Sequence, residues 1–144
     1  MKYIFLLIFL VSGSVSAAEV NNSVGLGLPH AGLGYQFSVS HKKQKYYLSA
    51  GALVLSAGAE FSLTRSDKHT LGLSYSRIPG VFSPDADLGA LNYTYYVNSF
   101  DKRGAFVGTS LFLAVRDEGE VFLSGSVERE ELGGIFLSVG YAFN

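Results

Sequence analysis

The final stretch of the chain, residues 134–144, alternates between two kinds of side chain. From Ile135 to Phe143 every second residue is large and apolar, and the residues between them are Phe136, Ser138, Gly140 and Ala142. Since successive side chains of a strand point to opposite faces, this stretch has one apolar face and one face of mostly small groups. A closed barrel in a bilayer requires that arrangement, with lipid outside. The segment therefore predicts a membrane-spanning strand.

The first 17 residues have the layout of a secretory signal peptide. Lys2 precedes an apolar run from Tyr3 to Val11, and small residues follow up to Ala17. The apolar run is roughly half the ~20 residues that a spanning helix needs. We therefore expect a signal peptide over residues 1–17, cleaved after Ala17 or Ala18, and one mature domain over residues 18–144.

Composition narrows the class of the mature domain. It has no apolar run long enough for a spanning helix, so an integral membrane protein would have to be a barrel. The chain has 0 cysteines, which removes any disulfide framework or thiolate metal site. Removing Lys2 from the 11 basic residues leaves 10 against 12 acidic ones, a balance that gives no argument for nucleic acid. The 17 glycines, 9 tyrosines and 11 phenylalanines favour strands and tight turns.

The same alternation recurs along the chain, interrupted by charged, turn-like clusters. It predicts an all-β fold, an up-and-down antiparallel transmembrane barrel of about eight strands. The expected strands cover residues 23–40, 45–54, 57–64, 70–78, 88–97, 105–116, 120–128 and 134–143. Two boundaries stay open: Pro29 either bends the first strand or makes a hairpin, and residues 46–64 form one strand or a hairpin near Ser56. An even count puts both termini in the periplasm.

These features together resemble the small eight-stranded outer-membrane barrels of the OmpA and OmpX type, in architecture rather than in any motif. The resemblance implies a Gram-negative envelope protein in the cell outer membrane, surrounded by lipid and lipopolysaccharide. It also implies assembly by the barrel-assembly machinery, which recognises a terminal phenylalanine and alternating apolar residues before it. Here Phe143 is followed by Asn144, so this match is offset by one residue.

Three polar residues alternate with apolar neighbours along their strands, so we expect them to face the barrel interior. Gln36 lies between Tyr35 and Phe37, Glu60 between Ala59 and Phe61, and Asn92 between Leu91 and Tyr93. An eight-stranded barrel is just wide enough for side chains to fill it, so we expect a hydrogen-bonded plug rather than a pore. A carboxylate there needs a cation or a proton, and the candidate cations for Glu60 are Arg77, Lys45 and Arg116.

The charged turns form the remaining functional surface. With eight strands and periplasmic termini, the predicted count puts residues 65–69, 99–104 and 128–133 on the outer side, and residues 79–87 and 117–120 on the inner side. If residues 120–128 were a loop, the sides would exchange. The candidate contacts to lipopolysaccharide phosphates on this count are Arg65, Lys68, Lys102 and Arg103.

Catalytic chemistry has little support in the sequence. A lipid A deacylase needs a serine nucleophile, a histidine base and an acid, and the loose candidates are His30, His41, His69, Ser40, Ser66 and Glu60. The His-x-Ser-Asn pattern of such deacylases does not occur. Three dispersed histidines lack metal-ligand spacing. The glycines at 25, 27, 32 and 34 lack the lysine and helix of a phosphate loop, so strand bends and close approach explain them better.

The sequence therefore favours a non-enzymatic, porin-like outer-membrane barrel without cofactor, catalytic residues or metal. Its role would be envelope integrity or surface interaction through its loops. Three alternatives stay open: a lipid A modifying enzyme, a narrow channel and a soluble periplasmic β-sandwich.

Overall fold

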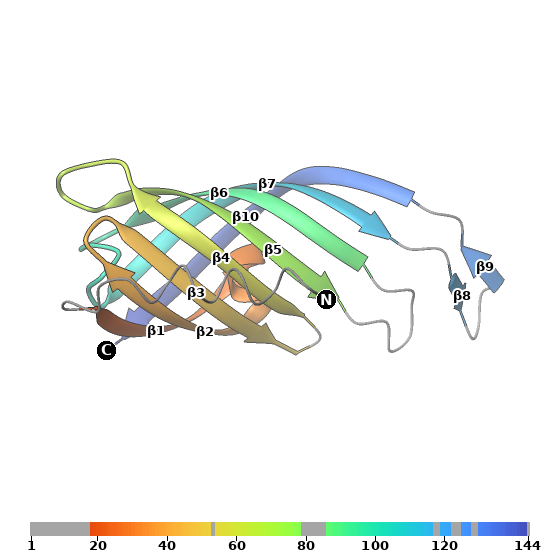
Figure 1. Ribbon diagram of the computed structural model, residues 1–144, viewed down its shortest axis with the longest axis horizontal. Helices are drawn as coiled ribbons and strands as arrows, with labels where there is room; N and C mark the ends of the chain where they lie inside the picture. The colour runs from red at the N-terminus through yellow and green to blue at the C-terminus, as the bar shows by residue number, and fades with distance from the viewer. Residues whose placement is uncertain are drawn as a thin grey trace, which may run out of the picture.

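The computed structural model describes residues 18–52, 54–78, 86–116, 119–121, 125–127 and 130–143. The expected signal peptide, residues 79–85 of the long loop, the predicted turn at residues 117–118 and Asn144 lie outside these ranges. The described chain forms a closed barrel and, beyond one end of it, a small two-stranded sheet (Figure 1). The barrel strands are β1 (Glu19–Gly27), β2 (Gly32–His41), β3 (Gln44–Gly51), β4 (Leu55–Ser62), β5 (His69–Ile78), β6 (Ala86–Tyr96), β7 (Gly104–Arg116) and β10 (Glu130–Phe143).

The predicted fold class is confirmed: eight antiparallel strands run up and down, and β1 pairs with β10 to close the sheet. Both open boundaries prove to be hairpins, β1–β2 around Pro29 and β3–β4 before Ser56. The expected strand over residues 120–128 is wrong, because β8 (Gly119–Val121) and β9 (Gly125–Val127) pair only with each other. The number of barrel strands is still eight, because the first predicted strand, residues 23–40, is in fact two strands, β1 and β2.

The register of the barrel is staggered. If the register partner of Val24 on β2 is followed to its own partner on β3, and so on around the barrel, the residue reached on β10 is Glu131. The direct partner of Val24 on β10 is Tyr141. The difference between positions 131 and 141 is a shear of ten residues. A closed sheet with such a shear has strongly tilted strands, and its narrow interior is filled by side chains.

The two ends of the barrel carry different connections. The start of β1 and the end of β10, which we call the termini of the barrel, lie at the end that carries the β2–β3 turn and the loops at residues 63–68 and 97–103 (left in Figure 1). The β1–β2 turn, the β3–β4 turn and the β8–β9 sheet lie at the opposite end. The expectation that residues 65–69 and 99–104 lie opposite the termini is therefore wrong. Two misjudged strands cause this error: the undivided first strand, residues 23–40, reverses these loops relative to the start of the barrel, and the strand expected at residues 120–128 reverses them relative to its end.

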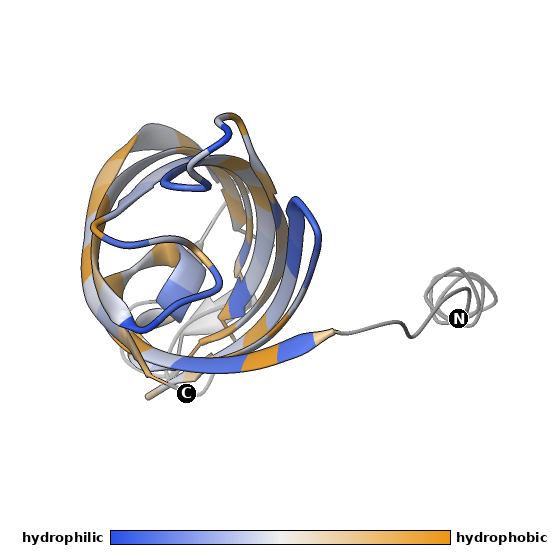
Figure 2. Cartoon of the chain, turned by 90° about the vertical axis from the view of Figure 1, so that its left-hand side faces the viewer, coloured by the Kyte–Doolittle hydropathy of each residue, from blue (hydrophilic) through white to orange (hydrophobic). Residues whose placement is uncertain are grey.

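Polar and apolar side chains are separated across the sheet. The view down the barrel shows the two kinds alternating along its strands (Figure 2). Large apolar side chains point outward from every barrel strand and stay exposed: Val24, Leu33, Leu48, Leu55, Leu73, Leu91, Leu113 and Leu137 are examples. The buried inner positions are mainly polar, among them Ser23, Gln36, Ser38, Lys45, Glu60, Thr70, Asn92, Thr94 and Ser110. The barrel thus lacks a conventional apolar core over most of its length.

Close backbone approach explains a glycine at the end of β3. A Cβ atom on Gly51 would overlap the carbonyl oxygen of Ala31, in the β1–β2 turn. Gly89 on β6 has open space at the same point of its backbone.

We expect Gly51→Ala to lower the stability by about 1–3 kcal/mol, because backbone atoms must move to admit the methyl group. The measurement is the midpoint of urea unfolding of the purified protein in detergent. Gly89→Ala is the matched control and should leave the midpoint nearly unchanged. Equal effects of the two substitutions would contradict the close approach.

Candidate functional site

The β1–β2 turn folds into the barrel instead of away from it. It contains the short 3-10 helix η1 (Leu28–His30), which contacts strands β1 to β5 and β10. Gly27 and Gly32 flank it with φ angles of 136° and 86°, and Ala31 adopts the left-handed region at 54°. Glycine reaches positive φ without steric cost, so the pair at residues 27 and 32 allows the chain to reverse inward. We call residues 28–31 the inner turn.

Hydroxyl and amide groups of the barrel wall hold the inner turn. Gln36 Nε2 donates to the carbonyl oxygen of Pro29 at 2.9 Å, and Ser49 Oγ donates to the same oxygen at 2.6 Å. Ser56 Oγ donates to the carbonyl oxygen of Leu28 at 3.1 Å. Buried carbonyls of a turn are costly unless they accept hydrogen bonds, so these three side chains compensate the burial of the turn.

His30 anchors the other side of the inner turn. Its Nε2 lies 2.9 Å from Ser23 Oγ, and its ring stacks on Phe106 at a centroid distance of 5.0 Å. Burial of the ring, and second the positive charge of Lys45, lower the pKa of His30 to about 3. The imidazole is therefore neutral at physiological pH and acts as an aromatic hydrogen-bonding group in the turn.

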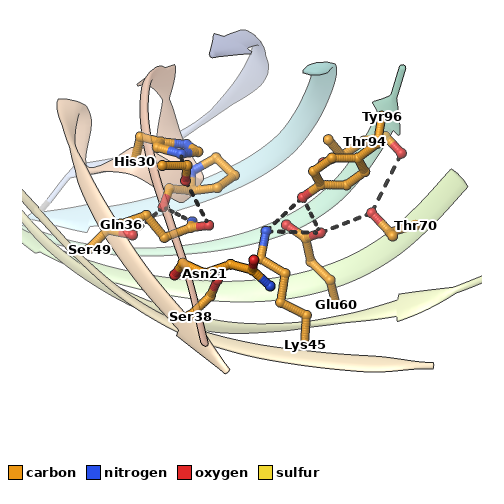
Figure 3. A network of polar contacts seen from close by, with 12 residues as sticks. Asn21, His30, Gln36, Ser38, Lys45, Ser49, Glu60, Thr70, Thr94 and Tyr96 are labelled. Carbon is orange, nitrogen blue, oxygen red and sulfur yellow. Dashed lines mark hydrogen bonds and ion pairs between the residues drawn. The ribbon is translucent and has the colours of Figure 1, made fainter. Parts of the chain in front are cut away.

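A second polar network lies beside the inner turn and contains two charged residues. Lys45 Nζ donates to Tyr96 Oη at 2.8 Å, and Tyr96 Oη donates to Glu60 Oε2 at 2.8 Å (Figure 3). Thr70 Oγ1 also donates to Glu60 Oε2 at 3.0 Å, and Lys45 Nζ lies 4.0 Å from that oxygen. All four side chains are buried. The carboxylate thus has two hydroxyl donors and a nearby ammonium group.

An aromatic cluster closes the interior at the end that holds the termini. Phe100, from the loop between β6 and β7, is buried with Tyr96 and Phe106. The loop is fixed by hydrogen bonds to the β4–β5 loop, since Phe100 N donates to Asp67 O and Tyr96 N donates to Lys68 O. Phe106 touches Tyr96 on one side and His30 on the other. It therefore links the two polar networks.

The three predicted interior residues lie inside the barrel. Gln36, Glu60 and Asn92 are 0%, 2% and 1% exposed. Gln36 holds the inner turn, Glu60 belongs to the charged network, and Asn92 Nδ2 donates to Ser74 Oγ at 2.8 Å.

Among the three candidate cations for Glu60, the structure selects Lys45. Arg77 is exposed on the outer face, across from Asp87. The position of the Arg116 side chain lies outside the description. Lys45 is the cross-strand partner of Glu60 between β3 and β4, which is why the two side chains meet inside the barrel.

The four basic residues proposed for lipopolysaccharide lie elsewhere than expected. Arg65 and Lys68 are in the β4–β5 loop, and Lys102 and Arg103 are in the β6–β7 loop, at the end that holds both termini. Contact with lipopolysaccharide stays a prediction, and it now requires the termini to lie at the outer surface.

The catalytic candidates do not assemble into a triad in the described part of the chain. His30 pairs with Ser23, which was not among the expected serines, and its Nδ1 has no hydrogen-bond partner there. His69 Nδ1 lies 2.7 Å from Tyr93 Oη at the barrel surface. A serine–histidine contact without an acid on the second ring nitrogen lacks the group that orients the base. The Ser23–His30 contact is accounted for by its role in holding the inner turn.

The described residues contain no group of three or more histidine, cysteine or acidic side chains placed to hold a metal ion. They also contain no helix with the length and apolar character to cross a membrane. No protein-family model, curated protein or solved structure matches the chain.

The sequence pattern does not predict the inner turn, because Pro29 fits a bend or a hairpin and the glycines at 25, 27, 32 and 34 fit bends and sites of close approach. Two glycines on each side of Leu28-Pro29-His30-Ala31 are the available signal, because they allow a reversal at both ends of a four-residue turn. The inward direction of the turn depends on hydrogen bonds between its carbonyl groups and side chains of distant strands.

The charged network yields a stability test. We expect Glu60→Leu to destabilise the barrel by about 3–5 kcal/mol, because Lys45 is left buried without its carboxylate. The double variant Lys45→Met with Glu60→Leu should recover most of that loss. Unfolding free energies from urea titration of wild type, both single variants and the double variant measure the coupling. Additive losses in the double variant would contradict a paired network.

Proposed function

We propose that the protein is a small outer-membrane barrel that spans the bilayer with a filled interior and acts without enzymatic activity. In this proposal it resembles the OmpA and OmpX type in function as well as in strand number. Its role is envelope integrity or surface interaction through loops. It is surrounded by outer-membrane lipid, and its insertion uses the barrel-assembly machinery.

The observation that carries the proposal is the inverted distribution of side chains. Leu33, Leu113 and Leu137 are 72%, 74% and 72% exposed on the outer face, while Gln36, Lys45 and Glu60 are buried inside. In water, so much exposed apolar surface favours association, and monomeric proteins avoid apolar patches larger than a few hundred Å². In a bilayer the same surface is solvated by hydrocarbon, and closure of the sheet pairs most of the backbone within the wall.

Aromatic side chains add support at one end of the apolar surface. Near the end that holds the termini, Phe37, Tyr46, Phe61, Tyr93 and Tyr141 point outward from five different strands. Aromatic rings with a polar edge favour the headgroup region, so this ring of residues fits the boundary between hydrocarbon and water. Tyr46 faces outward, whereas its neighbour Tyr47 faces the interior.

The long connection between β7 and β10 supports the usual orientation of such barrels, whereas the loops at residues 63–68 and 97–103 are longer than the β1–β2 and β3–β4 turns at the opposite end. If both termini face the periplasm, the inner turn, the β3–β4 turn and the β8–β9 sheet belong to the outer side. The β8–β9 sheet extends beyond the end of the barrel (right in Figure 1). Longer connections on the outer side and short turns on the periplasmic side are the rule for bacterial barrels. Surface interaction in this proposal belongs to that outer end.

The filled interior favours a sealed barrel over the alternative of a narrow channel. The inner turn, the Lys45–Glu60 network and Phe100 occupy successive parts of the interior. We expect planar bilayers containing the purified protein to carry no steady ionic current. A stable single-channel conductance would contradict the sealed interior and would favour the channel.

Cell fractionation with gel electrophoresis tests the location. We expect the protein in the outer-membrane fraction, with a mobility in detergent gels that changes when the sample is boiled, because the closed sheet persists in unheated detergent. A periplasmic protein that is monodisperse in buffer without amphiphile would overturn the proposal and favour the soluble alternative. Unchanged acylation of lipid A in cells lacking the gene is expected, and a change would favour the enzyme.

Substitutions of two exposed leucines test whether lipid or water surrounds the outer face of the barrel. Leu73 lies in the middle of β5 and is 64% exposed, whereas Leu63 lies in the β4–β5 loop and is 56% exposed. We expect Leu73→Arg to cost about 2–4 kcal/mol in lipid, because it puts a charge in hydrocarbon. Leu63→Arg, outside the strands, should be nearly neutral. Unfolding in phospholipid vesicles measures both, and a neutral Leu73→Arg would contradict the membrane location.

A further inference from the structure

Basic side chains gather at the end of the barrel that holds its termini. The β2–β3 turn and the loops at residues 63–68 and 97–103 contain six basic residues and two acidic ones, namely Lys42, Lys43, Arg65, Lys68, Lys102 and Arg103 against Asp67 and Asp101. Glu19, at the start of β1, is the third acidic residue of this end. Residues 69–96 and 104–144 together have three basic residues and eight acidic ones. The near balance of the whole chain therefore conceals a positive end, and we call these three connections the basic end.

The acidic side chains of the basic end are engaged within their own part of the chain. Asp67 Oδ1 accepts a hydrogen bond from Ser62 Oγ at 2.5 Å, and Asp101 Oδ1 accepts one from Ser99 Oγ. Within the described residues, none of the six basic side chains forms an ion pair. Five of them are exposed, and Lys68 is half-buried. The positive charge of the basic end is therefore available to the surroundings.

Backbone hydrogen bonds fix the three connections relative to one another. Ser62 N, at the end of β4, donates to Lys43 O in the β2–β3 turn at 2.8 Å. Phe100 N, in the β6–β7 loop, donates to Asp67 O in the β4–β5 loop at 3.0 Å. The backbone positions of the cations are thus set before any partner binds, which lowers the entropy that binding costs.

The basic end lies directly beyond the aromatic side chains that point outward near the same end. Lys43 comes three residues before Tyr46, and Arg65 comes four residues after Phe61. Figure 2 views the barrel from this end, where the loops are mainly hydrophilic. Interfacial aromatic rings favour the headgroup region, so cations just beyond them lie at the level of lipid phosphates.

From this charge and depth we infer that the basic end binds the phosphate groups of anionic phospholipid in the leaflet that faces the periplasm. The inference rests on the proposed membrane location and orientation, which put both termini of the barrel on that side. Ammonium and guanidinium groups donate charge-assisted hydrogen bonds to phosphate, and each cation near an anionic surface adds to the attraction. A zwitterionic headgroup carries the same phosphate, but its ammonium group is repelled by the cations. The basic end therefore selects lipids with a net negative charge.

A single tryptophan can report the lipids beside the basic end, because the natural chain has 0 tryptophans. The purified full chain with Phe61→Trp is reconstituted in phosphatidylcholine vesicles that contain some phosphatidylglycerol, and each lipid is supplied in turn in brominated, quenching form. We expect phosphatidylglycerol to be enriched about fivefold beside this tryptophan at low salt. The enrichment should fall at about 1 M salt, where the charges are screened. Leu33→Trp, at the opposite end of the barrel on β2, is the matched control and should report no enrichment.

Charge variants in the Phe61→Trp background test whether the exposed cations cause the enrichment. The combined substitutions Lys43→Gln, Arg65→Gln, Lys102→Gln and Arg103→Gln should reduce it to about twofold or less. The charge-conserving set Lys43→Arg, Arg65→Lys, Lys102→Arg and Arg103→Lys should retain it. The change in gel mobility on boiling checks that each variant is folded. Equal quenching by the two lipids before these substitutions, or an enrichment that the glutamine set leaves unchanged, would overturn the inference.

Cysteine labelling in cells distinguishes the two sources of phosphate, because the natural chain has 0 cysteines. We expect Lys102→Cys to react with a membrane-impermeant thiol reagent only after the outer membrane is permeabilised. Labelling of intact cells would put the basic end at the cell surface, which would overturn phospholipid as its partner and favour the phosphates of lipopolysaccharide. Absence of lipid enrichment in a protein of the outer-membrane fraction would overturn only the binding. Recovery of the chain in a soluble fraction would overturn the membrane location itself.

Discussion

Closure of the sheet by pairing of β1 with β10 is the constraint on which the rest of the molecule depends. Only a closed sheet gives each strand an inside and an outside, so the period of two in the sequence becomes a polar interior and an apolar surface. The ten-residue stagger that accompanies closure tilts the strands, and the small number of strands, eight, keeps the barrel narrow. Any group inside the barrel must then fit into a space about as wide as the side chains that face one another across it.

The narrow interior explains why polar groups there are organised in networks. A hydroxyl or carbonyl removed from water is costly without a partner, and a charge is more so. Glu60 is accommodated by Tyr96, Thr70 and Lys45, and the carbonyls of the inner turn are accommodated by Gln36, Ser49 and Ser56. Because Phe106 packs between His30 and Tyr96, the turn and the ion pair support each other. A filled interior fits a structural protein better than a conduit.

The sequence predicted the face of the sheet on which a side chain lies better than it predicted the end of the barrel at which a loop lies. Gln36, Glu60 and Asn92 were assigned to the interior from their neighbours alone, and they lie there. The loop at Arg65 was assigned to the wrong end relative to the termini, because one misjudged strand on each side of it, at residues 23–40 and at residues 120–128, reverses its position relative to each terminus. Alternation over residues 120–128 resembled a barrel strand, yet β8 and β9 are too short to join the wall and pair with each other instead. Local pattern carries no information on whether a strand has a neighbour to pair with.

By itself, the sequence determined the class of the fold and the face on which each side chain of a strand lies, since both follow from a local period of two. Tertiary structure decided what those faces meet: that Lys45, and not Arg77, reaches Glu60, and that residues 28–31 turn into the barrel. It also decided that β10 extends beyond β1 and that residues 130–137 have one partner strand among the described residues. These features depend on register and stagger summed over eight strands, which no stretch of residues encodes locally.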